Sequence, residues 1–492
     1  MVGKVVRPGG VSSTAGPSRL ADLWLTLLEP ASPPEKGETT VKQRKASTEA
    51  VRRATDLQIQ NPDAAGIDLG SREHFVAVPE DRDTQPVKGF GCYTQDLHLL
   101  ARWLKDCAIT TVAMESTGVY WVPVYEILEQ YGFEVHLVDA RQLKNVSGRK
   151  SDVQDCQWIQ RLHSYGLLSS AFRPLPEIAT LRSYWRQRKG LTDECGRLIQ
   201  LMHKALEQMN VQLHKAVADV TGKTGLEIIR AIVAGERQPE QLVRFRHAAC
   251  KVGPQEFVAA LNGNFKDEHV FALRQSLAAY DFYQGLLQEC DQQMQTYMAQ
   301  LPSRTEPDTA APHKRRKNQP YFDLRREQVR ISGIDLTVAP GIDVLTAQSV
   351  FSEVGLDVER FPSDKNFASW LCLCPNNRKT GGRIRSSRTR RNAHRLATAL
   401  RLAAQSVGRS KTALGAFYRR LAARIGAAKA ITATARKLAC IIYRMLKYGQ
   451  AYVEQGQLAY EQAYKQRSIN NIRRQAHNLG FHLVAATTGE VS

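Results

Sequence analysis

Short apolar segments that end in a carboxylate constrain this chain more than any other feature of its sequence. Asp68 ends one apolar run and Glu115 ends another, whereas Asp152 and Asp155 are spaced i, i+3. Residues three apart share one face of a helix. Mg²⁺ prefers hard carboxylate oxygens with water and substrate phosphate, and a pair of ions can hold both oxygens of an in-line phosphoryl displacement. The four acids therefore predict a divalent-metal site for chemistry on nucleic acid.

Two other interpretations of these acids exist. Each acid alone could be a helix cap or a solvated charge, but that reading does not explain acids that end two separate apolar strands. The segment 66–70 also looks like the first phosphate loop of actin-like ATPases. Those proteins need a second, glycine-rich phosphate loop, and the nearest echo, residues 333–337, lacks the glycines. The metal site is the stronger interpretation.

The residues around the acids predict an α/β layer, because strand and helix patterns alternate. Beyond residue 155 the pattern is almost wholly helical. Two long apolar periodicities, over about 191–213 and 270–301, predict a long hairpin or coiled coil with a smaller helical piece between them. The expected strands end at 68, 78, 115 and 138, and the expected helices cover about 95–106 and 122–130.

The C-terminal part has a weaker pattern. Pro340, Gly341, Ile342 and Asp343 interrupt two short helical patterns within 336–355. Helix, glycine turn and helix form a helix-hairpin-helix, whose turn amides can bind a DNA phosphate. Because Asp343 stands where a second glycine is expected, a plain helical turn fits as well. A loop is expected over 375–382 and helix over 392–446.

The charge of the chain favours a polyanionic partner. There are 68 Lys and Arg against 48 Asp and Glu, a formal net charge of +20. The segment 365–453 has 20 basic residues and no acid, so it carries the whole excess. Nine scattered cysteines fit a reducing compartment, and no apolar run reaches the length of a membrane span. We therefore expect no membrane partner and a cytoplasmic, nucleoid-associated protein.

Within this acid-free segment, Thr380 lies among glycines and arginines. Neighbouring arginines and metal ions could stabilise an alkoxide that attacks phosphorus, and Gly381 and Gly382 would allow close approach of the backbone to a substrate. A solvated basic loop that only neutralises phosphates is the simpler interpretation. The candidate nucleic-acid contacts are Arg149, Lys150, Arg378, Lys379, Gly381, Gly382, Arg383, Arg385, Arg388, Arg390, Arg391 and Arg395.

Five motifs in this order carry a family resemblance: 66–68, 115–118, 150–155, 340–342 and 375–382. Together they resemble the bacterial insertion-sequence transposases that have an aspartate-glutamate-aspartate-aspartate, RuvC-like catalytic domain and are relatives of site-specific DNA invertases. The resemblance covers about residues 62–455. It implies an α/β ribonuclease H-like (RuvC-like) domain, then a helical coiled coil and a mainly α-helical C-terminal domain.

The resemblance also implies a mechanism and partners. The acids Asp68, Glu115, Asp152 and Asp155 would bind Mg²⁺, and a hydroxyl of the C-terminal domain would attack DNA to give a covalent intermediate. A structured bridge RNA would pair with donor and target DNA. Strand exchange needs one nucleophile for each cut strand, which implies a homodimer or homotetramer.

The chain departs from the family pattern at one position. The family nucleophile is typically a serine before glycine, whereas this chain has Thr380 before Gly381. The extra methyl of threonine restricts its rotamers and crowds an in-line approach. Thr380 is the expected nucleophile; Ser386 or Ser387 could substitute, or this copy could be impaired.

The resulting expectation is a transposase with six regions. A metal-dependent junction endonuclease and a non-enzymatic nucleic-acid-binding protein are the alternatives. The expected regions are an extension (1–60), the RuvC-like domain (61–180), a helical or coiled-coil region (181–301), a basic linker (302–325), the C-terminal transposase domain (326–455) and a tail (456–492).

Overall fold

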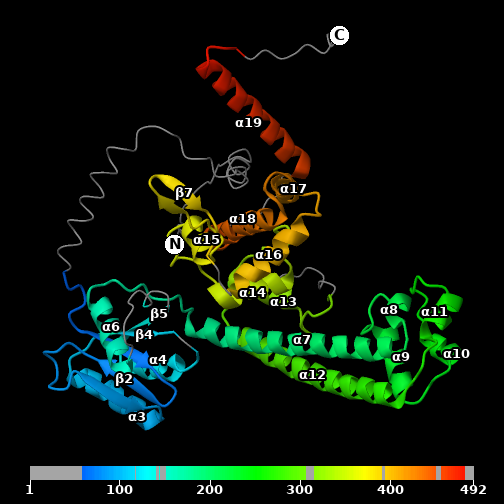
Figure 1. The fold of residues 1–492 in the computed structure, drawn as a ribbon, viewed down its shortest axis with the longest axis horizontal. Helices are drawn as coiled ribbons and strands as arrows, with labels where there is room; N and C mark the ends of the chain where they lie inside the picture. Colours follow the sequence, from blue (N-terminus) through cyan, green and yellow to red (C-terminus); the bar gives the residue numbers. More distant parts are fainter. Residues whose placement is uncertain are drawn as a thin grey trace, which may run out of the picture. The chain divides into compact units, whose positions relative to one another are not determined.

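The computed structural model describes residues 58–116, 118–139, 143, 151–305, 315–390, 394–449 and 456–482. Over these ranges the chain forms two compact units, of which one ends at Arg173 and the other begins at Pro174 (Figure 1). The extension expected over 1–60 lies outside the described residues except for its last three. No helix within the described ranges has both the length and the apolar character needed to cross a bilayer.

The first unit is built on a five-stranded mixed sheet with the strand order β3-β2-β1-β4-β5. β1 pairs antiparallel with β2 and β2 with β3, whereas β1–β4 and β4–β5 are parallel. This sheet with its helices confirms the α/β layer and fits a ribonuclease H-like domain. Its elements are β1 (Ala64–Leu69), β2 (Glu73–Ala77), β3 (Val87–Gly91), α3 (Thr94–Asp106), β4 (Thr111–Glu115), α4 (Trp121–Gln130), β5 (Glu134–Val138) and α6 (Asp152–Ser164).

The two faces of the sheet are covered by different helices. Side chains alternate between the faces of a strand, so Ile67 and Met114 point to the side of α3 and α4, where they join the main core of this unit. Ala113 and Val138 point to the other side and pack against Ile159 of α6. Asp68 and Glu115, which follow Ile67 and Met114, therefore lie on the α6 face.

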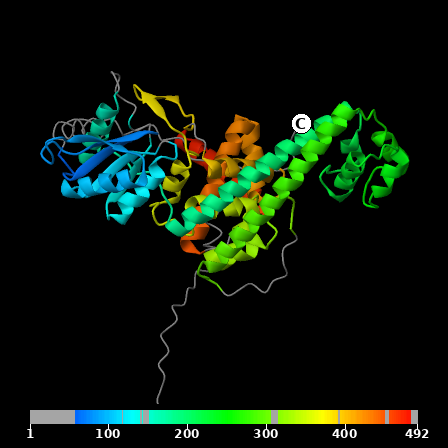
Figure 2. The ribbon, with the colours of Figure 1, turned by 90° about the horizontal axis from the view of Figure 1, so that it is seen from below.

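The second unit begins with a long antiparallel helical hairpin, formed by α7 (Pro176–Gln208) and α12 (Asp267–Gln300). Both views show the two helices lying side by side with short helices at the far end (Figures 1 and 2). The hairpin expected from the two periodicities is thus present, while a coiled-coil supercoil remains a prediction. The short helices at the tip are α8 (Leu213–Ala216), α9 (Lys223–Val233), α10 (Pro239–Leu242), η1 (Val243–Phe245) and α11 (Pro254–Leu261).

A buried ion pair joins the two long helices. Arg188 of α7 donates to Asp291 of α12 at 2.5 Å, with side chains 6% and 1% exposed. The backbone N–H of Tyr321 donates to the same carboxylate at 3.1 Å, and Lys317 binds Asp219 near the tip at 2.6 Å. Residues 315–323 of the expected basic linker (302–325) are therefore bound along the hairpin.

The remaining elements form a mainly α-helical region with one two-stranded sheet. Within 336–355, the segment before Pro340 is only the three-residue 3-10 helix η2 (Leu336–Val338). Asp343 caps the following helix, α14, by accepting from the Thr346 N–H at 2.8 Å. The structure therefore gives no support to a helix-hairpin-helix at 336–355. The elements are α13 (Leu324–Ser332), η2 (Leu336–Val338), α14 (Val344–Val354), α15 (Asp364–Trp370), β6 (Arg378–Thr380), β7 (Arg383–Ser386), α16 (Arg395–Val407), α17 (Ala413–Ile425), α18 (Ala427–Tyr448) and α19 (Gly456–Asn478).

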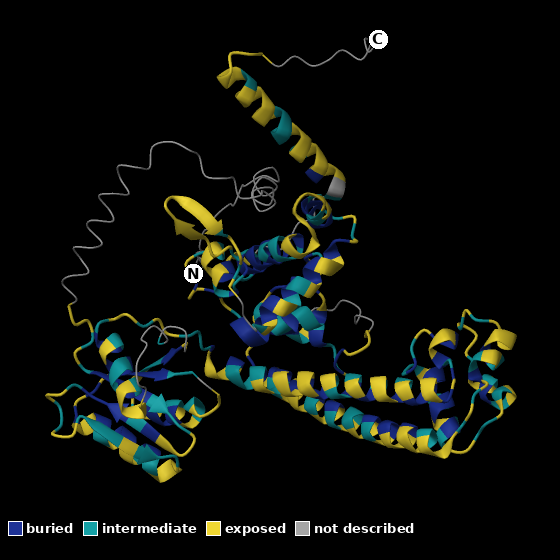
Figure 3. Cartoon of the chain, viewed as in Figure 1, coloured by how far each residue is buried: buried dark blue, intermediate teal, exposed yellow. Residues whose placement is uncertain are grey.

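One expectation for this region differs from the structure, because the segment expected as a loop at 375–382 contains β6 and belongs to a β-hairpin. The region expected as a tail, 456–492, contains the 23-residue helix α19. α19 is exposed along most of its length (Figure 3). It contacts α17 through its first turns, where Arg420 stacks on the rings of Tyr460 and Tyr464.

Candidate active site and nucleic-acid interface

Two of the predicted acids lie next to each other at the carboxyl end of parallel strands. In the β1–β4 register Ile67 pairs with Met114, so the following residues, Asp68 and Glu115, are neighbours on the α6 face. Adjacent strands are about 4.8 Å apart. Both side chains are partly buried, which holds the carboxylates in a restricted space beside the sheet.

Helix α6 brings the other two acids to the same edge. A Cβ on Gly66 would lie 2.4 Å from the Cys156 carbonyl oxygen and 2.3 Å from the Gln160 backbone nitrogen, so only glycine permits this close packing of α6 on β1. Gln160 also donates to the Ala64 carbonyl at 3.4 Å. Gln160, in the second half of α6, contacts the start of β1, whereas Cys156, nearer the start of α6, contacts Gly66 further along β1. α6 therefore runs antiparallel to β1, and its first turn lies near Asp68.

The first turn of α6 contains both remaining acids. Ser151 caps the helix by accepting from the Gln154 N–H at 3.4 Å, and Asp152 and Asp155 follow directly. Acids are favoured at this end of a helix because the helix dipole is positive there. A sequence that folds as an ordinary capped helix therefore also supplies two carboxylates to the edge of the sheet.

The electrostatics around Asp68 show that the four acids act on one another. The pKa of Asp68 is raised to about 6, first by burial and then by the negative charges of Asp155, Asp152 and Glu115, against the Leu69 N–H, which lowers it. Like charges that oppose ionisation in a half-buried site favour a bound cation. Carboxylate oxygens are also the donors that Mg²⁺ prefers, so this set fits a divalent metal ion.

The described residues do not form a finished coordination sphere. No group of three or more His, Cys, Asp or Glu side chains in the described ranges is already arranged around a single point. The four acids are therefore close enough to interact electrostatically but not gathered as ligands. Arg149 and Lys150, predicted beside the acid pair, lie outside the described residues.

Thr380 lies in the second unit, at the end of β6. β6 and β7 form a hairpin whose turn residues, Gly381 and Gly382, have φ of 55° and 74°. Positive φ at both central positions is typical of a type I′ turn and favours glycine. A Cβ at either glycine would meet no atom within 4 Å. Glycine is therefore favoured at these two positions by the positive φ of the backbone, and not by close packing.

The hairpin register decides which side chains accompany Thr380. Thr380 pairs with Arg383, and directly opposed residues share a face with Cβ atoms about 5 Å apart. Ser386 lies at the other end of the hairpin, opposite Arg378, and its hydroxyl accepts from the Arg388 N–H at 3.4 Å. Ser387 follows the end of β7. Of the three candidate hydroxyls, Thr380 is the one beside the glycine turn.

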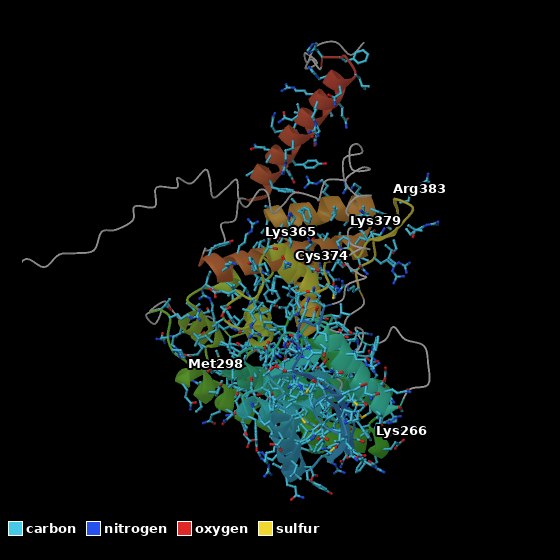
Figure 4. All side chains as sticks on the ribbon, turned by 90° about the vertical axis from the view of Figure 1, so that its left-hand side faces the viewer. Lys266, Met298, Lys365, Cys374, Lys379 and Arg383 are labelled. Carbon is cyan, nitrogen blue, oxygen red and sulfur yellow. The ribbon has the colours of Figure 1, made fainter. Side chains whose placement is uncertain are left out.

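The basic side chains of the hairpin are exposed. Arg378, Lys379, Arg383 and Arg385 lie in its strands, and none of them forms an ion pair within the described part of the chain. Figure 4 shows Arg383 at the outer end of the hairpin, directed into solvent. Arg388, Arg390 and Arg395 are also exposed, whereas Arg391 lies outside the described residues.

A cluster of Arg186, Glu353 and His394 beside the start of α16 was not predicted. Arg186 of α7 binds Glu353 of α14 at 2.7 Å, and the Glu353 side chain is 7% exposed. The ring of His394, the residue before α16, packs edge-on against Trp370 at 4.5 Å. Arg186 and Glu353 are 167 residues apart, so no local sequence pattern indicates that they meet.

The comparisons with known proteins agree with this geometry. A family model described as a transposase, the DEDD type of the IS110 group, matches residues 65–211, which include all four acids. A second model, the transposase IS116/IS110/IS902 family, matches residues 335–419, which include the β6–β7 hairpin. No curated protein gives a match. The two matches support an IS110-type transposase, and the chain is a DNA transposase of the DEDD type.

Proposed function

We propose that this transposase excises and inserts an insertion-sequence element by strand exchange through a covalent protein–DNA intermediate. The position of Thr380 is the observation that supports the proposal. Its hydroxyl lies beside a glycine turn and on the same face as Arg383. The surrounding segment, 365–453, contains 20 basic residues and no acid. A guanidinium next to the hydroxyl stabilises negative charge on the attacked phosphate.

In this proposal the four acids form the metal-binding part of the reaction. Asp68 and Glu115 are held by adjacent strands, and Asp152 and Asp155 by the first turn of α6. Mg²⁺, when bound there, supplies positive charge that neutralises the phosphate in the transition state. The acids are then the residues that fix the phosphate at the edge of the sheet.

The proposed first step is a phosphoryl transfer. A bond forms between Thr380 Oγ1 and phosphorus while the bond from phosphorus to one sugar oxygen breaks, and the hydroxyl proton ends on that leaving oxygen. In the second step the sugar hydroxyl of another strand attacks the same phosphorus and loses its proton. The Thr380 oxygen leaves and regains a proton. No net hydrolysis occurs, so the number of phosphodiester bonds is conserved.

The proposed partners are DNA and RNA. The exposed basic hairpin and the acid-free stretch provide phosphate contacts, and the family resemblance implies a bridge RNA that pairs with element ends and target. It also implies a homodimer or homotetramer, because each cut strand needs its own nucleophile.

A covalent-adduct assay tests the proposal. The full chain is incubated with Mg²⁺, labelled element-end DNA and RNA transcribed beside its gene, and protein–DNA adducts are detected after denaturation. We expect an adduct that is lost in Thr380→Val, retained in Thr380→Ser and absent in Asp68→Asn. Thr380→Val keeps the shape and β-branching of the side chain, so loss reports the hydroxyl.

Other outcomes of this assay contradict the proposal. Cleaved DNA without an adduct identifies a metal-dependent junction endonuclease in which water attacks. An adduct that persists in Thr380→Val and is lost in Ser386→Ala or Ser387→Ala assigns the nucleophile to that serine. The double variant Ser386→Ala/Ser387→Ala is the matched control and is expected to retain the adduct.

A further inference from the structure

The loop that follows the acid Glu115 exposes two apolar side chains in succession. Val119 is 72% exposed and Tyr120 is 46% exposed. Both lie between β4 and α4, five residues or fewer after Glu115. Large apolar side chains are ordinarily found in the core or singly on a surface. Two exposed ones in succession, in the loop after Glu115, indicate a surface that a ligand covers.

The topology places Tyr120 at the edge of the sheet that carries the acids. β4 and β5 are parallel and α4 connects them, so α4 must begin at the carboxyl end of β4, where Glu115 lies. Tyr120 is the N-cap residue of α4. In α/β sheets, ligands bind in the crevice outside the carboxyl ends of parallel strands.

The neighbours of Tyr120 leave its ring accessible. Gly118 has a φ of +64°, and a Cβ there would lie 3.6 Å from the Tyr120 ring, so the glycine leaves one side of the ring without a covering side chain. The next two aromatic residues are engaged: Trp121 packs edge-on against Tyr125 at 6.0 Å, and Arg173 stacks on Tyr125 at 3.8 Å.

We propose that Tyr120 is a stacking platform for an unpaired nucleobase of the DNA strand whose phosphate would be held by the Mg²⁺ that the acids bind. This proposal rests on the proposed function of the four acids. Stacking on an aromatic ring suits any base, because every base has a π-face, and an alanine substitution at such a platform lowers affinity about five- to hundredfold. A base extruded next to the attacked phosphate fixes that phosphate in register with Asp68 and Glu115.

A second exposed tyrosine on this unit provides a matched control. Tyr93 is 77% exposed and caps α3. Its backbone N–H donates to the Asp96 carboxylate at 3.2 Å, and the Glu73 carboxylate lies over Gly89 of the neighbouring strand. Tyr93 follows β3, which β2 separates from the acid-bearing strands β1 and β4, so we expect no stacking of the same base on Tyr93.

Photochemical crosslinking in the full chain tests the proposal. The probes are element-end DNA duplexes, each with one 5-iododeoxyuridine at a different position along the end, bound to the Thr380→Val protein with Mg²⁺ and the RNA transcribed beside the gene. Because iodouracil crosslinks to aromatic rings that stack on it, the crosslinked peptide is identified by mass spectrometry. We expect a crosslink at Tyr120 that falls at least tenfold in Tyr120→Ala and stays within twofold in Tyr120→Phe and in Tyr93→Ala.

The possible results separate this proposal from the proposed function. Crosslinks that map elsewhere, or a yield unchanged in Tyr120→Ala, overturn the platform even if the covalent adduct forms. A Tyr120 crosslink, together with no covalent adduct in the parent protein, supports the platform and contradicts strand exchange. Circular dichroism of Tyr120→Ala must match the parent protein, and rescue by Tyr120→Phe shows that the ring acts on DNA and not through folding.

Discussion

Asp68 has a carboxyl group that resists ionisation because of its position. Burial is the largest cause of its raised pKa, about 6, and the charge of Asp155 is the next. We expect Asp155→Asn to lower the pKa of Asp68, while burial keeps that pKa above its ordinary value. Carbon-13 NMR titration of the metal-free protein measures the shift.

A control variant makes this prediction specific. Asp81 is 77% exposed and pairs with Arg82, so Asp81→Asn should leave the Asp68 pKa unchanged. An equal response to Asp81→Asn and Asp155→Asn would contradict the inferred proximity of Asp155 to Asp68. Millimolar Mg²⁺ should abolish the raised pKa in the parent protein, since a cation stabilises the ionised carboxylate.

His163, at the far end of α6, makes stability depend on pH. The pKa of His163 is lowered to about 4, first by burial and then by the charge of His136; its Nε2 lies 2.9 Å from the Thr111 hydroxyl. The unfolded chain binds the proton near pH 6.5, so His163 favours the folded state above that pH, and this stability is lost as pH falls from 6.5 towards 4.

The pH effect is measurable by a substitution. Between pH 6.5 and 4.5, the free energy of unfolding measured in urea should fall by about 2 kcal/mol more in the parent protein than in His163→Gln. Asp68 acts in the opposite sense, because its raised pKa favours folding as pH falls, and it contributes equally to both proteins. Identical pH slopes in the two proteins would show that His163 is not the group responsible.

At the scale of elements, the contact of α6 with β1 decides where the acids lie. Gly66→Ala places a methyl group against the α6 backbone, so we expect unfolding to require about 3 kcal/mol less free energy and metal affinity to fall. Gly190→Ala, in an exposed part of α7 where a Cβ meets nothing within 4 Å, should raise stability by about 0.5–1 kcal/mol. Chemical denaturation of both variants measures the difference, and similar effects would contradict the close packing of α6.

The buried ion pair of the α7–α12 hairpin gives an element-scale prediction. Asp291→Ala leaves Arg188 buried without its partner, which costs about 3–5 kcal/mol. Asp281→Ala, on the same helix, removes a pair with Arg230 whose side chains are 51% and 45% exposed, and it should cost less than about 1 kcal/mol. Thermal unfolding distinguishes the two, and equal losses would argue against a buried pair.

The elements also show what the sequence can predict. β1 and β4 were predictable because a buried apolar run ends in an acid, and the start of α6 because Asp152 and Asp155 are spaced i, i+3. β3 was not, because Gly89 and Gly91 weaken its strand pattern. β6 and β7 have only three and four residues and are mostly polar, and α19 is polar as well. None of these three elements shows an apolar periodicity.

The sites were predictable to a different extent. Spacing and strand ends identified the four acids, since local sequence determines where a strand ends. Tyr120 gave no such signal, because only the crossover from β4 to α4 places it at the same edge. The Glu353 cluster and the Arg188–Asp291 pair join residues more than 100 positions apart, and contacts of this kind depend on tertiary packing.

At the scale of the whole molecule, the uneven charge predicts strongly salt-dependent binding. If Arg383 and Arg385 each contact a phosphate, Arg383→Gln/Arg385→Gln should reduce the slope of log affinity against log salt by about 2. Lys189→Gln is the control, because Lys189 is already paired with Asp193. Fluorescence anisotropy with labelled duplex at several salt concentrations measures the slope, and an unchanged slope would remove these arginines from the interface.

The braced helical hairpin sets a fixed length in the molecule. α7 has 33 residues, which at 1.5 Å per residue span about 50 Å. The 315–323 segment binds it partway along, at Asp291, and near the tip, at Asp219, so the arm resists bending. The hairpin is therefore a ruler: a duplex that touches its base and its tip at once must present those two points about 15 base pairs apart.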